Sequence, residues 1–459
     1  MCRASGRSYS WPSYVPVILA SIVIGLALPA TSVLANPTHI TPETNHEISE
    51  LIAMDDDELL NIISKKSFDY FWLEANPNNG LIRHYSEENS PSGIAAVGLG
   101  LTAIPVGIKR GWISREEGYK RTITTLITLT SDKISRENGF FYQFLDMSDG
   151  SRFNESQVSS MDTCILIAGV LFVGEFFSGT PVQDLAYDLY SQVNWRWMMN
   201  SGETPAKSWT PEAGFSKARW DSFGESLIMY VLAIGSPTYP IPTSAWHNFR
   251  RPVRENYIST LGENLASYVL PHVWLDLRGK GDYYANYWNN VVFAARYNRI
   301  YSMLKCSKST GHTLNIWGLG ECEGPGGYCT YGASAANYDG TLTPYAPMGC
   351  MPFSPDISMQ AIREVLRKHG ELTWAKYGFT SGFNVDKSWW SGTHHAINQG
   401  ISLLMIENYR TGFIWKHAAG NHLIQRGLDH IQFSPSKTSE AVTPAYLMEI
   451  EGKHYSWDF

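Results

Sequence analysis

The strongest constraint on the fold is a series of apolar segments that are too long and too continuous for β-strands. They recur over residues 98–109, 162–177, 225–234, 358–368 and 396–409. Strict alternation of polar and apolar residues, the signal of a half-buried strand, never runs far along the chain. Helices that are apolar nearly all round must be covered on every side. The pattern therefore predicts an all-α fold in which buried helices alternate with outer partner helices.

The order of these segments also indicates how the chain is organised. A buried helix, a long loop and a partner helix repeat, which is typical of a ring of antiparallel helix pairs whose loops gather at one end and carry the site. The 459 residues suffice for one large domain, and no shift in composition marks a second one. We expect a lead-in segment over residues 36–54, the helical domain over 55–435 and a C-terminal tail over 436–459.

The first 35 residues have the pattern of a secretory signal peptide. Arg3 and Arg7 give a positive start, residues 15–30 are apolar, and residues 33–35 offer a cleavage site before Asn36. An uncleaved membrane anchor is the alternative, but the apolar run is short for a span and prolines interrupt it. We therefore expect an exported protein, periplasmic or secreted, with no membrane contact after cleavage.

Charge and aromatic content narrow the class of partner. The formal net charge is −7, which argues against nucleic acid because nucleic-acid binding needs a basic surface. Aromatic residues make up 13% of the chain and include 16 Trp. A large core accounts for many of them, but sugar-binding clefts also use aromatic faces as stacking platforms. A carbohydrate partner is therefore favoured.

The cysteines show no spacing typical of a zinc site, so we expect no metal and no cofactor. Cys322 and Cys329 flank a Gly-Pro-Gly-Gly loop and could form a local disulfide, with Cys306 and Cys350 as a second pair.

The segment Trp-Asp-Ser-Phe-Gly-Glu at 220–225, directly before an apolar helix, is the first candidate for acid/base chemistry. Asp221 and Glu225 are four residues apart, so the start of a helix would put both on one face. Trp220 and Phe223 would partly desolvate them, which raises the pKa of a carboxyl and suits a general acid. Ordinary N-capping explains Asp221 equally well, whereas a functional role is favoured for Glu225.

Two further acids are candidates for the same chemistry. Asp162 begins a helix that Ser159 or Ser160 can cap, which leaves its carboxylate for a cleft. Glu323 lies in a glycine-rich loop at 317–328 that lacks the lysine of a phosphate-binding loop. A flexible turn and a sugar-contacting loop account for that segment equally well.

A pyranose ring needs a flat aromatic face and hydrogen-bonding partners. The side chains predicted to bind sugar are Trp220, Trp317, Tyr328, Trp389, Trp390, His394, His395 and Arg83. Buried packing explains the two adjacent tryptophans nearly as well, and the two histidines lack a third ligand for a metal. Glu407 and Arg410, three apart on a helix, are interpreted as a salt bridge.

Several segments, taken in order over about residues 55–435, resemble the glycoamylase-like domain of bacterial endo-β-1,2-glucanases. They are Phe-Asp-Tyr-Phe-Trp at 68–72, Ser-Ser-Met-Asp-Thr at 159–163, Tyr-Val-Leu-Ala-Ile-Gly-Ser-Pro-Thr at 230–238, Trp-Gly-Leu at 317–319 with Gly-Pro at 324–325, and the stretch 399–412. The resemblance implies an (α/α)6 toroid, a metal-free, inverting acid/base mechanism and β-1,2-glucan as substrate. It places essential acids at Asp162 and Glu225.

The chain departs from that family pattern at four positions. Ser159, Ser381 and Asn398 stand where the glucanases often carry acids, and Glu323 stands where Asp is more usual. These departures bear on the choice of base more than on the fold.

The sequence thus predicts an endo-acting glycoside hydrolase that cleaves a β-glucan, with Glu225 as general acid and Asp162 as base. Asp221 or Glu323 could share the second role. A polysaccharide lyase is one alternative, because lyases also use α/α toroids, but they neutralise uronates with cations and this chain is acidic. A glycan-binding relative without activity is the other, motivated by Ser159 and Asn398.

Overall fold

Helices are the main elements of the structure, a computed structural model that describes the backbone of residues 42–254, 257–306, 315–334, 336–436, 446–450 and 453–457. Six of the described helices are buried along most of their length: α3 (Ile94–Lys109), α5 (Ser160–Phe176), α8 (Leu227–Gly235), α10 (Leu265–Val269), α12 (Tyr345–Gly349) and α14 (Ala396–Thr411). Longer helices with an exposed face are α1 (Pro42–Ala53), α2 (Asp56–Leu73), α4 (Arg115–Thr130), α6 (Pro181–Gln192), α11 (Tyr287–Cys306), α13 (Pro355–Thr373) and α16 (His422–Ile431). Shorter helices are α7 (Trp195–Met199), α9 (Ser244–Asn248), η1 (Leu270–Val273) and α15 (Phe413–Gly420). The all-α fold expected from the sequence is confirmed.

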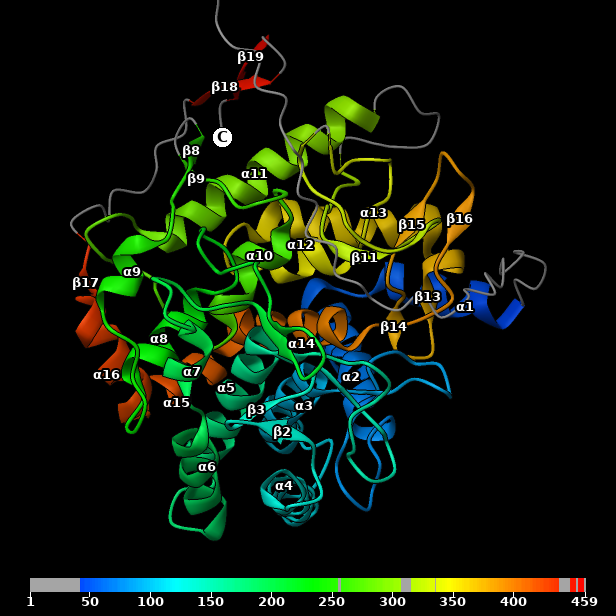
Figure 1. Cartoon of the computed structure of the whole chain (residues 1–459). Helices are drawn as coiled ribbons and strands as arrows, with labels where there is room; N and C mark the ends of the chain where they lie inside the picture. The colour runs from blue at the N-terminus through cyan, green and yellow to red at the C-terminus, as the bar shows by residue number, and fades with distance from the viewer. Residues whose placement is uncertain are drawn as a thin grey trace, which may run out of the picture. The chain divides into compact units, whose positions relative to one another are not determined.

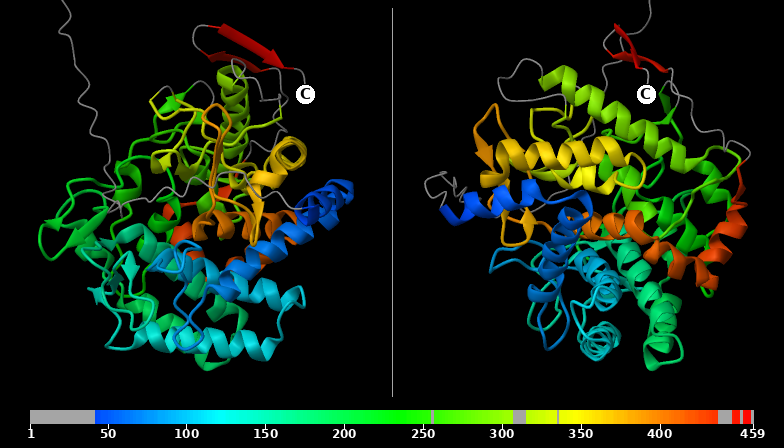
Figure 2. Two further views of the ribbon diagram at one scale, coloured as in Figure 1. Left: turned by 90° about the vertical axis from the view of Figure 1, so that its right-hand side faces the viewer. Right: turned by 180° about the vertical axis from the view of Figure 1, so that it is seen from behind.

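The buried helices pack against one another in a consistent order. α3 packs against α5 and α14, α5 packs against α8, and α14 packs against α12, which packs against α10. Outer helices cover them, with α4 beside α3, α6 beside α5, α16 beside α8 and α13 beside α12 (Figures 1 and 2). The first and last helices of the buried series, α3 and α14, are therefore neighbours, as expected for a ring of helix pairs.

Glycines bring two of the buried helices into backbone contact. A Cβ on Gly169 of α5 would lie 2.0 Å from the carbonyl oxygen of Gly98, and a Cβ on Gly98 of α3 would lie 2.4 Å from the carbonyl oxygen of Ile165. No side chain fits at such distances, so these two positions set how closely α3 and α5 approach.

Local sequence signals determine where several helices begin and end. Ser114 and Glu117 form the capping box expected before α4, in which Ser114 Oγ accepts a hydrogen bond from the Glu117 N–H at 3.2 Å. α14 ends at Gly412, whose φ of 63° is the left-handed conformation that glycine adopts without strain.

Short strands lie at the N-terminal ends of α3 and α5. β1 (Ser92–Gly93) precedes α3 and pairs with β4 (Phe144–Leu145), while β5 (Val158–Ser159) precedes α5 and pairs with β6 (Ser208–Thr210), which pairs with β7 (Gly214–Phe215). At the start of α3 the Ile94 N–H donates to the Gln143 carbonyl, whose own N–H donates to Gln157. At the start of α14 the Ala396 N–H donates to the His84 carbonyl. The starts of three neighbouring buried helices therefore lie at one end of the domain.

Most of the other strands form two-stranded antiparallel pairs. They are β2 (Arg136–Glu137) with β3 (Phe140–Phe141), β8 (Val253–Arg254) with β9 (Tyr257–Ile258), β10 (Lys280–Gly281) with β17 (Ser434–Pro435), β11 (Glu321–Gly324) with β12 (Gly327–Thr330), β13 (Trp374–Ala375) with β14 (Gly378–Phe379), β15 (Phe383–Asn384) with β16 (Trp389–Trp390), and β18 (Tyr446–Ile450) with β19 (Lys453–Trp457).

The lead-in expected over residues 36–54 contains α1, which packs against α13. The segment 1–35 lies outside the described residues. Among the helices that the structure describes, none combines the length and the apolarity that a membrane span needs.

Candidate active site

Asp162 lies in the first turn of α5, at the end of the domain where the helices start. Ser159 caps this helix by accepting a hydrogen bond from the Asp162 N–H at 3.2 Å, as the sequence suggested, and its hydroxyl donates to Asp162 Oδ2 at 2.5 Å. Burial raises the pKa of Asp162 to about 6, the Ser159 hydrogen bond opposes this shift, and the charge of Glu225 adds to it. The side chain is half-buried.

Glu225 lies in the turn that leads into α8 and is also half-buried. Its Oε2 accepts a hydrogen bond from Ser267 Oγ of α10 at 2.8 Å. Trp220 lies at the start of α5, because its indole N–H donates to Ser160 Oγ at 2.8 Å, and Lys207 Nζ lies 4.3 Å from the centroid of the Trp220 ring. The segment 220–225 therefore connects the start of α5 with the start of α8.

The glycine-rich loop expected at 317–328 is in part a hairpin, β11–β12, with a turn at residues 324–327. Gly327 has a φ of 103°, which explains why the turn needs glycine there. Glu321 lies opposite Thr330 and Glu323 lies opposite Tyr328, so the four side chains share one face of the hairpin. Cys322 lies opposite Cys329 on the other face.

The disulfide expected across this hairpin is not formed in the structure. Cys322 and Cys329 are free thiols, the first buried and the second exposed. Cys350 is also a free, buried thiol, and the side chain of Cys306 lies outside the described residues.

Glu321 is the functional candidate that the sequence analysis missed. Its carboxyl accepts hydrogen bonds from Tyr328 Oη at 3.4 Å and from Thr330 Oγ1 at 3.5 Å. Burial raises the pKa of Glu321 to about 8, and the negative charge of Glu225 raises it further, whereas Lys207 lowers it. We call Asp162, Glu225 and Glu321 the carboxyl cluster, because Glu225 acts electrostatically on both of the others.

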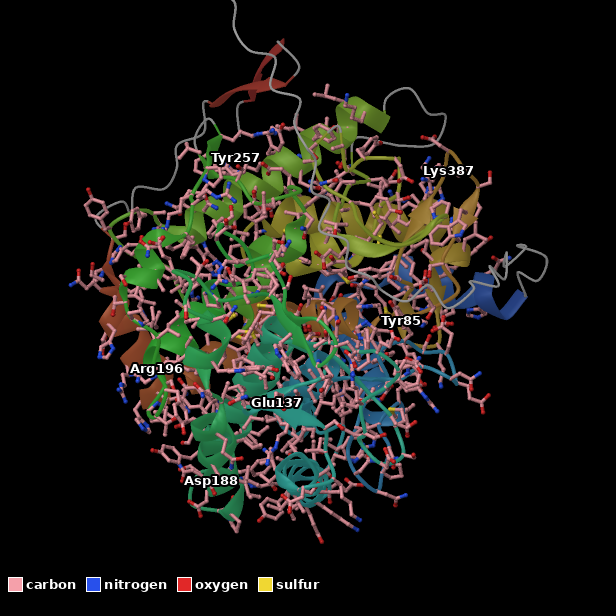
Figure 3. All side chains as sticks on the ribbon, in the orientation of Figure 1. Tyr85, Glu137, Asp188, Arg196, Tyr257 and Lys387 are labelled. Atoms are coloured by element: carbon pink, nitrogen blue, oxygen red, sulfur yellow. The ribbon has the colours of Figure 1, made fainter. Side chains whose placement is uncertain are left out.

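Glu323 faces a different set of neighbours from the same hairpin. Its Oε2 accepts a hydrogen bond from Ser391 Oγ at 2.9 Å. Burial raises the pKa of Glu323 to about 7, and the charge of Glu87 adds to this shift. Its charge also acts on the phenol of Tyr85, which Figure 3 labels. The hairpin thus presents one acid to the carboxyl cluster and another to the loop that carries Tyr85 and Glu87.

Asp221 does not join the carboxyl cluster. Both of its carboxylate oxygens lie 3.3 Å from Arg250 Nη2, and both side chains are largely exposed. The expected shared face with Glu225 required a helix through both residues, but α8 begins only at Leu227. This corrects the prediction for Asp221, whose carboxylate forms a surface ion pair.

The predicted sugar-binding aromatic residues differ in exposure: Tyr328 is exposed, Trp389 and Trp390 are half-buried, and Trp317 is buried. Tyr328 is 41% exposed and its ring stacks on His395 with centroids 5.0 Å apart. Trp389 and Trp390 of β16 are half-buried, next to Ser391, which binds Glu323. Trp317, however, is only 1% exposed and its indole N–H donates to the Ile357 carbonyl. The prediction for Trp317 is corrected, because a buried ring offers no face to a sugar.

The polar residues predicted to bind sugar use their hydrogen bonds within the protein. His394 Nε2 contacts the Gly378 carbonyl at 3.2 Å, and His395 Nε2 contacts His84 Nε2 at 2.9 Å. Burial lowers the pKa of His394 to about 4 and that of His395 well below its usual value, so both rings are neutral at pH 7. Arg83 Nη1 donates to Glu74 Oε2 at 2.6 Å. Burial corrects the prediction for the two histidines, which support the Tyr328 side of the site from within, whereas sugar binding by the part-buried Arg83 stays a prediction.

Comparison with known proteins shows which family and which solved structures the chain resembles. Residues 217–421 match the family model Glycoamylase, whose members are described as glucoamylases. The chain is 28% identical over 422 residues to the exo β-1,2-glucooligosaccharide sophorohydrolase (non-reducing end) of Parabacteroides distasonis, covering 83% of this chain. Its structure superposes on the Chitinophaga pinensis endo-β-1,2-glucanase, in complex with sophorotriose and glucose, with a TM-score of 0.75 and 27% identity over 83% of this chain and 99% of that one. Over residues 217–421 the chain is therefore similar to the glycoamylase family.

A second protein with a similar structure is the β-1,2-glucanase of Parabacteroides distasonis, with a TM-score of 0.76 and 25% identity over 83% of this chain. The match covers 60% of that chain, and the match to the sophorohydrolase covers 58% of its length. The chain thus matches about six-tenths of the length of each of these two relatives.

The family departures noted in the sequence lie around the site. Ser159 binds Asp162, as described above. Ser381 Oγ accepts hydrogen bonds from the Glu323 N–H at 3.3 Å and from Asn398 Nδ2 at 3.1 Å, so a neutral pair lies beneath Glu323. Within the described part of the chain, no three side chains of His, Cys, Asp or Glu group closely enough to hold a metal ion.

Proposed function

We propose that this chain hydrolyses β-1,2-glucan by acid/base catalysis at the carboxyl cluster. The observation that carries the proposal is the cluster itself, in which Asp162, Glu225 and Glu321 come from three different elements and are each half-buried. Groups with perturbed pKa values that act on one another are typical of catalytic sites. The activities of the relatives, a sophorohydrolase and an endo-β-1,2-glucanase that act on β-1,2-linked glucans, support the choice of substrate.

The roles within the cluster follow from glycoside hydrolysis, which needs one carboxylic acid and one carboxylate. Glu225 donates its proton to the glycosidic oxygen. Asp162, with a pKa of about 6, is ionised at neutral pH and accepts the proton of the attacking water. Glu323, with a pKa of about 7, is the second candidate for the base.

Aromatic rings around the carboxyls support binding of a sugar chain. Trp220 is half-buried at the start of α5, and Tyr328 exposes its ring on the same hairpin face as Glu321. Trp389 and Trp390 extend this set toward Glu323. Such rings stack on the apolar faces of glucose units.

The test is product analysis of the purified chain with linear β-1,2-glucan, beside β-1,3- and β-1,4-glucan. We expect oligosaccharides from the β-1,2 chain alone. Binding without product at any pH would favour a glycan-binding role, and products with absorbance near 235 nm, expected of unsaturated uronates made from a uronate polymer, would favour a lyase.

The same digestion separates the modes of attack. Early release of mixed lengths indicates endo action, as in the predicted activity, whereas sophorose alone indicates the exo action named for the sophorohydrolase. NMR of the first products gives the anomer, and we expect inversion. Export is proposed from the signal-peptide pattern, and N-terminal sequencing of the mature protein, with Asn36 expected first, tests it.

A further inference from the structure

Glu321 occupies a position that brings it next to the general acid. The Leu265 N–H at the start of α10 donates to the Leu319 carbonyl at 3.0 Å, so α10 is fastened to the chain just before β11. Ser267, which donates a hydrogen bond to Glu225, follows Leu265 by two residues. Glu321 likewise follows Leu319 by two residues. Tyr345 of α12 interacts electrostatically with both glutamates. The hairpin and α10 therefore bring Glu321 near Glu225, close enough for the charge of each to act on the other.

The groups that face Glu321 are mostly neutral. From its own hairpin come the phenol of Tyr328 and the hydroxyl of Thr330, and from α12 comes the phenol of Tyr345. The charged groups that act on it are the carboxylate of Glu225 and the ammonium of Lys207, which lies over the Trp220 ring.

No ion pair with a described residue neutralises Glu321, in contrast to the buried Glu407, which pairs with Lys109 and Arg110. Two crowded carboxyls without a bound cation tend to retain one proton between them.

We propose that Glu321 carries a proton at neutral pH and shares it with Glu225, which makes Glu321 a positioning residue for the acid step. The catalytic part of this inference rests on the proposed function, whereas the protonation does not. Burial, the first cause of its raised pKa, agrees with this assignment.

The proton count of the site is unchanged over one turnover. The one proton that Glu321 and Glu225 share passes from Glu225 to the glycosidic oxygen. The attacking water supplies its oxygen and one hydrogen to the new hydroxyl, and its second proton returns to the carboxyl cluster. One water is consumed and one glycosidic bond is broken.

The first test measures protonation without any substrate. A carboxyl whose folded pKa exceeds its unfolded value stabilises the fold fully at pH below about 4 and loses that contribution as pH rises through the folded pKa. Glu321→Gln cannot ionise, so its Tm relative to wild type should rise by several degrees between pH 5 and pH 9. Glu212→Gln, at an exposed ion pair with Arg152, is the control and should show no such trend. A Tm difference that is independent of pH would overturn the proposal.

The second test is the pH profile of kcat. In Glu321→Gln the acid step at low pH should persist, because Glu225 can take a proton from water. At pH 8 kcat should be about tenfold lower than in wild type, the factor that corresponds to one pKa unit. Equal loss at every pH would show a merely structural role and overturn the proposal.

Lys207→Met gives a second variant should Glu321→Gln fold poorly. Removing the cation that lowers the pKa of Glu321 should move the alkaline limb of kcat, and the loss of stability, to higher pH. No shift in either would overturn the proposal. If no glucan is hydrolysed but the Tm trend is found, the proposed function fails and the protonation of Glu321 stands. If glucan is hydrolysed but neither the Tm difference nor kcat of the variants changes with pH as expected, the proposed function stands and the protonation of Glu321 fails.

Discussion

Carboxyl groups at the two ends of the buried helices have opposite electrostatic surroundings. At the C-terminal ends of α14 and α3, Glu407 is fully buried and accepts hydrogen bonds from Lys109 Nζ at 2.7 Å and from Arg110 Nε at 2.8 Å. At the N-terminal end of α5, Asp162 has only Ser159 as a hydrogen-bonding side chain and faces the charge of Glu225.

The difference teaches how to separate structural from chemical acids in this fold. A buried carboxylate paired with two cations holds two helices together, whereas carboxyls that crowd one another have shifted proton affinities and can exchange protons. The sequence suggested that Glu407 is structural, which agrees with these contacts, but Arg410 is not its partner. Arg410 instead binds both oxygens of Asp57 on α2.

The largest expected effect is at the acid itself. Glu225→Gln keeps the shape of the side chain and its neighbour Ser267 but removes the proton that the leaving group needs. We expect kcat/KM on β-1,2-glucan to fall by a factor on the order of 10³ or more, because general acid catalysis contributes about 10²–10⁴. The Tm should stay close to that of wild type, and a fully active variant would exclude this role.

The next largest effect is expected at the C-terminal ends of α3 and α14, where Glu407 lies. Glu407→Ala leaves Lys109 and Arg110 without their buried partner, which should reduce the free energy of unfolding by about 3–5 kcal/mol. Urea unfolding measures the loss, and kcat per folded molecule should be retained. A large fall in kcat at full folding would contradict the division between the two ends.

A smaller effect is expected from pH. Because the base must be ionised and the pKa of Asp162 is about 6, kcat/KM should fall by about tenfold per pH unit below pH 6. In Asp162→Asn any residual activity should lack this acid limb. An unchanged limb in the variant would move the base to Glu323.

The smallest effect is expected at Asp221, which the structure places outside the carboxyl cluster. Asp221→Asn breaks an exposed ion pair with Arg250, and such pairs contribute about 0–1 kcal/mol. We expect kcat to stay within about twofold of wild type, which thermal melting and turnover on β-1,2-glucan would check. A loss comparable to that of Glu225→Gln would restore Asp221 to the site.

The helices could be predicted because their signals are local. Continuous apolar runs and capping residues lie within one segment, and α3, α5 and α14 follow them closely. Asp162 and Glu225 were also found from local context. The cluster's third member was missed because Glu321 gains its role from strand pairing with Thr330 and from proximity to Glu225, which lies 96 positions earlier in the chain.

The burial of His395 and Trp317, which were predicted to bind sugar, could not be read from the sequence for the same reason. His395 is buried by contact with His84, which is 311 positions away in the chain. Trp317 is buried beneath Ile357. A histidine or tryptophan beside a functional loop has the same sequence appearance whether it points outward or inward, since burial depends on partners that only the fold brings near.

The backbone contact between Gly98 and Gly169 limits how this protein can be re-engineered. Because no side chain separates α3 from α5 there, the spacing of their N-terminal ends cannot be adjusted by exchanging core residues of different size. New substrate preferences would have to come from the connections above the helices, such as the turn of β11–β12, where Gly326 has open space around it. Mutant libraries aimed at altered specificity should therefore vary that turn and leave both helix glycines fixed.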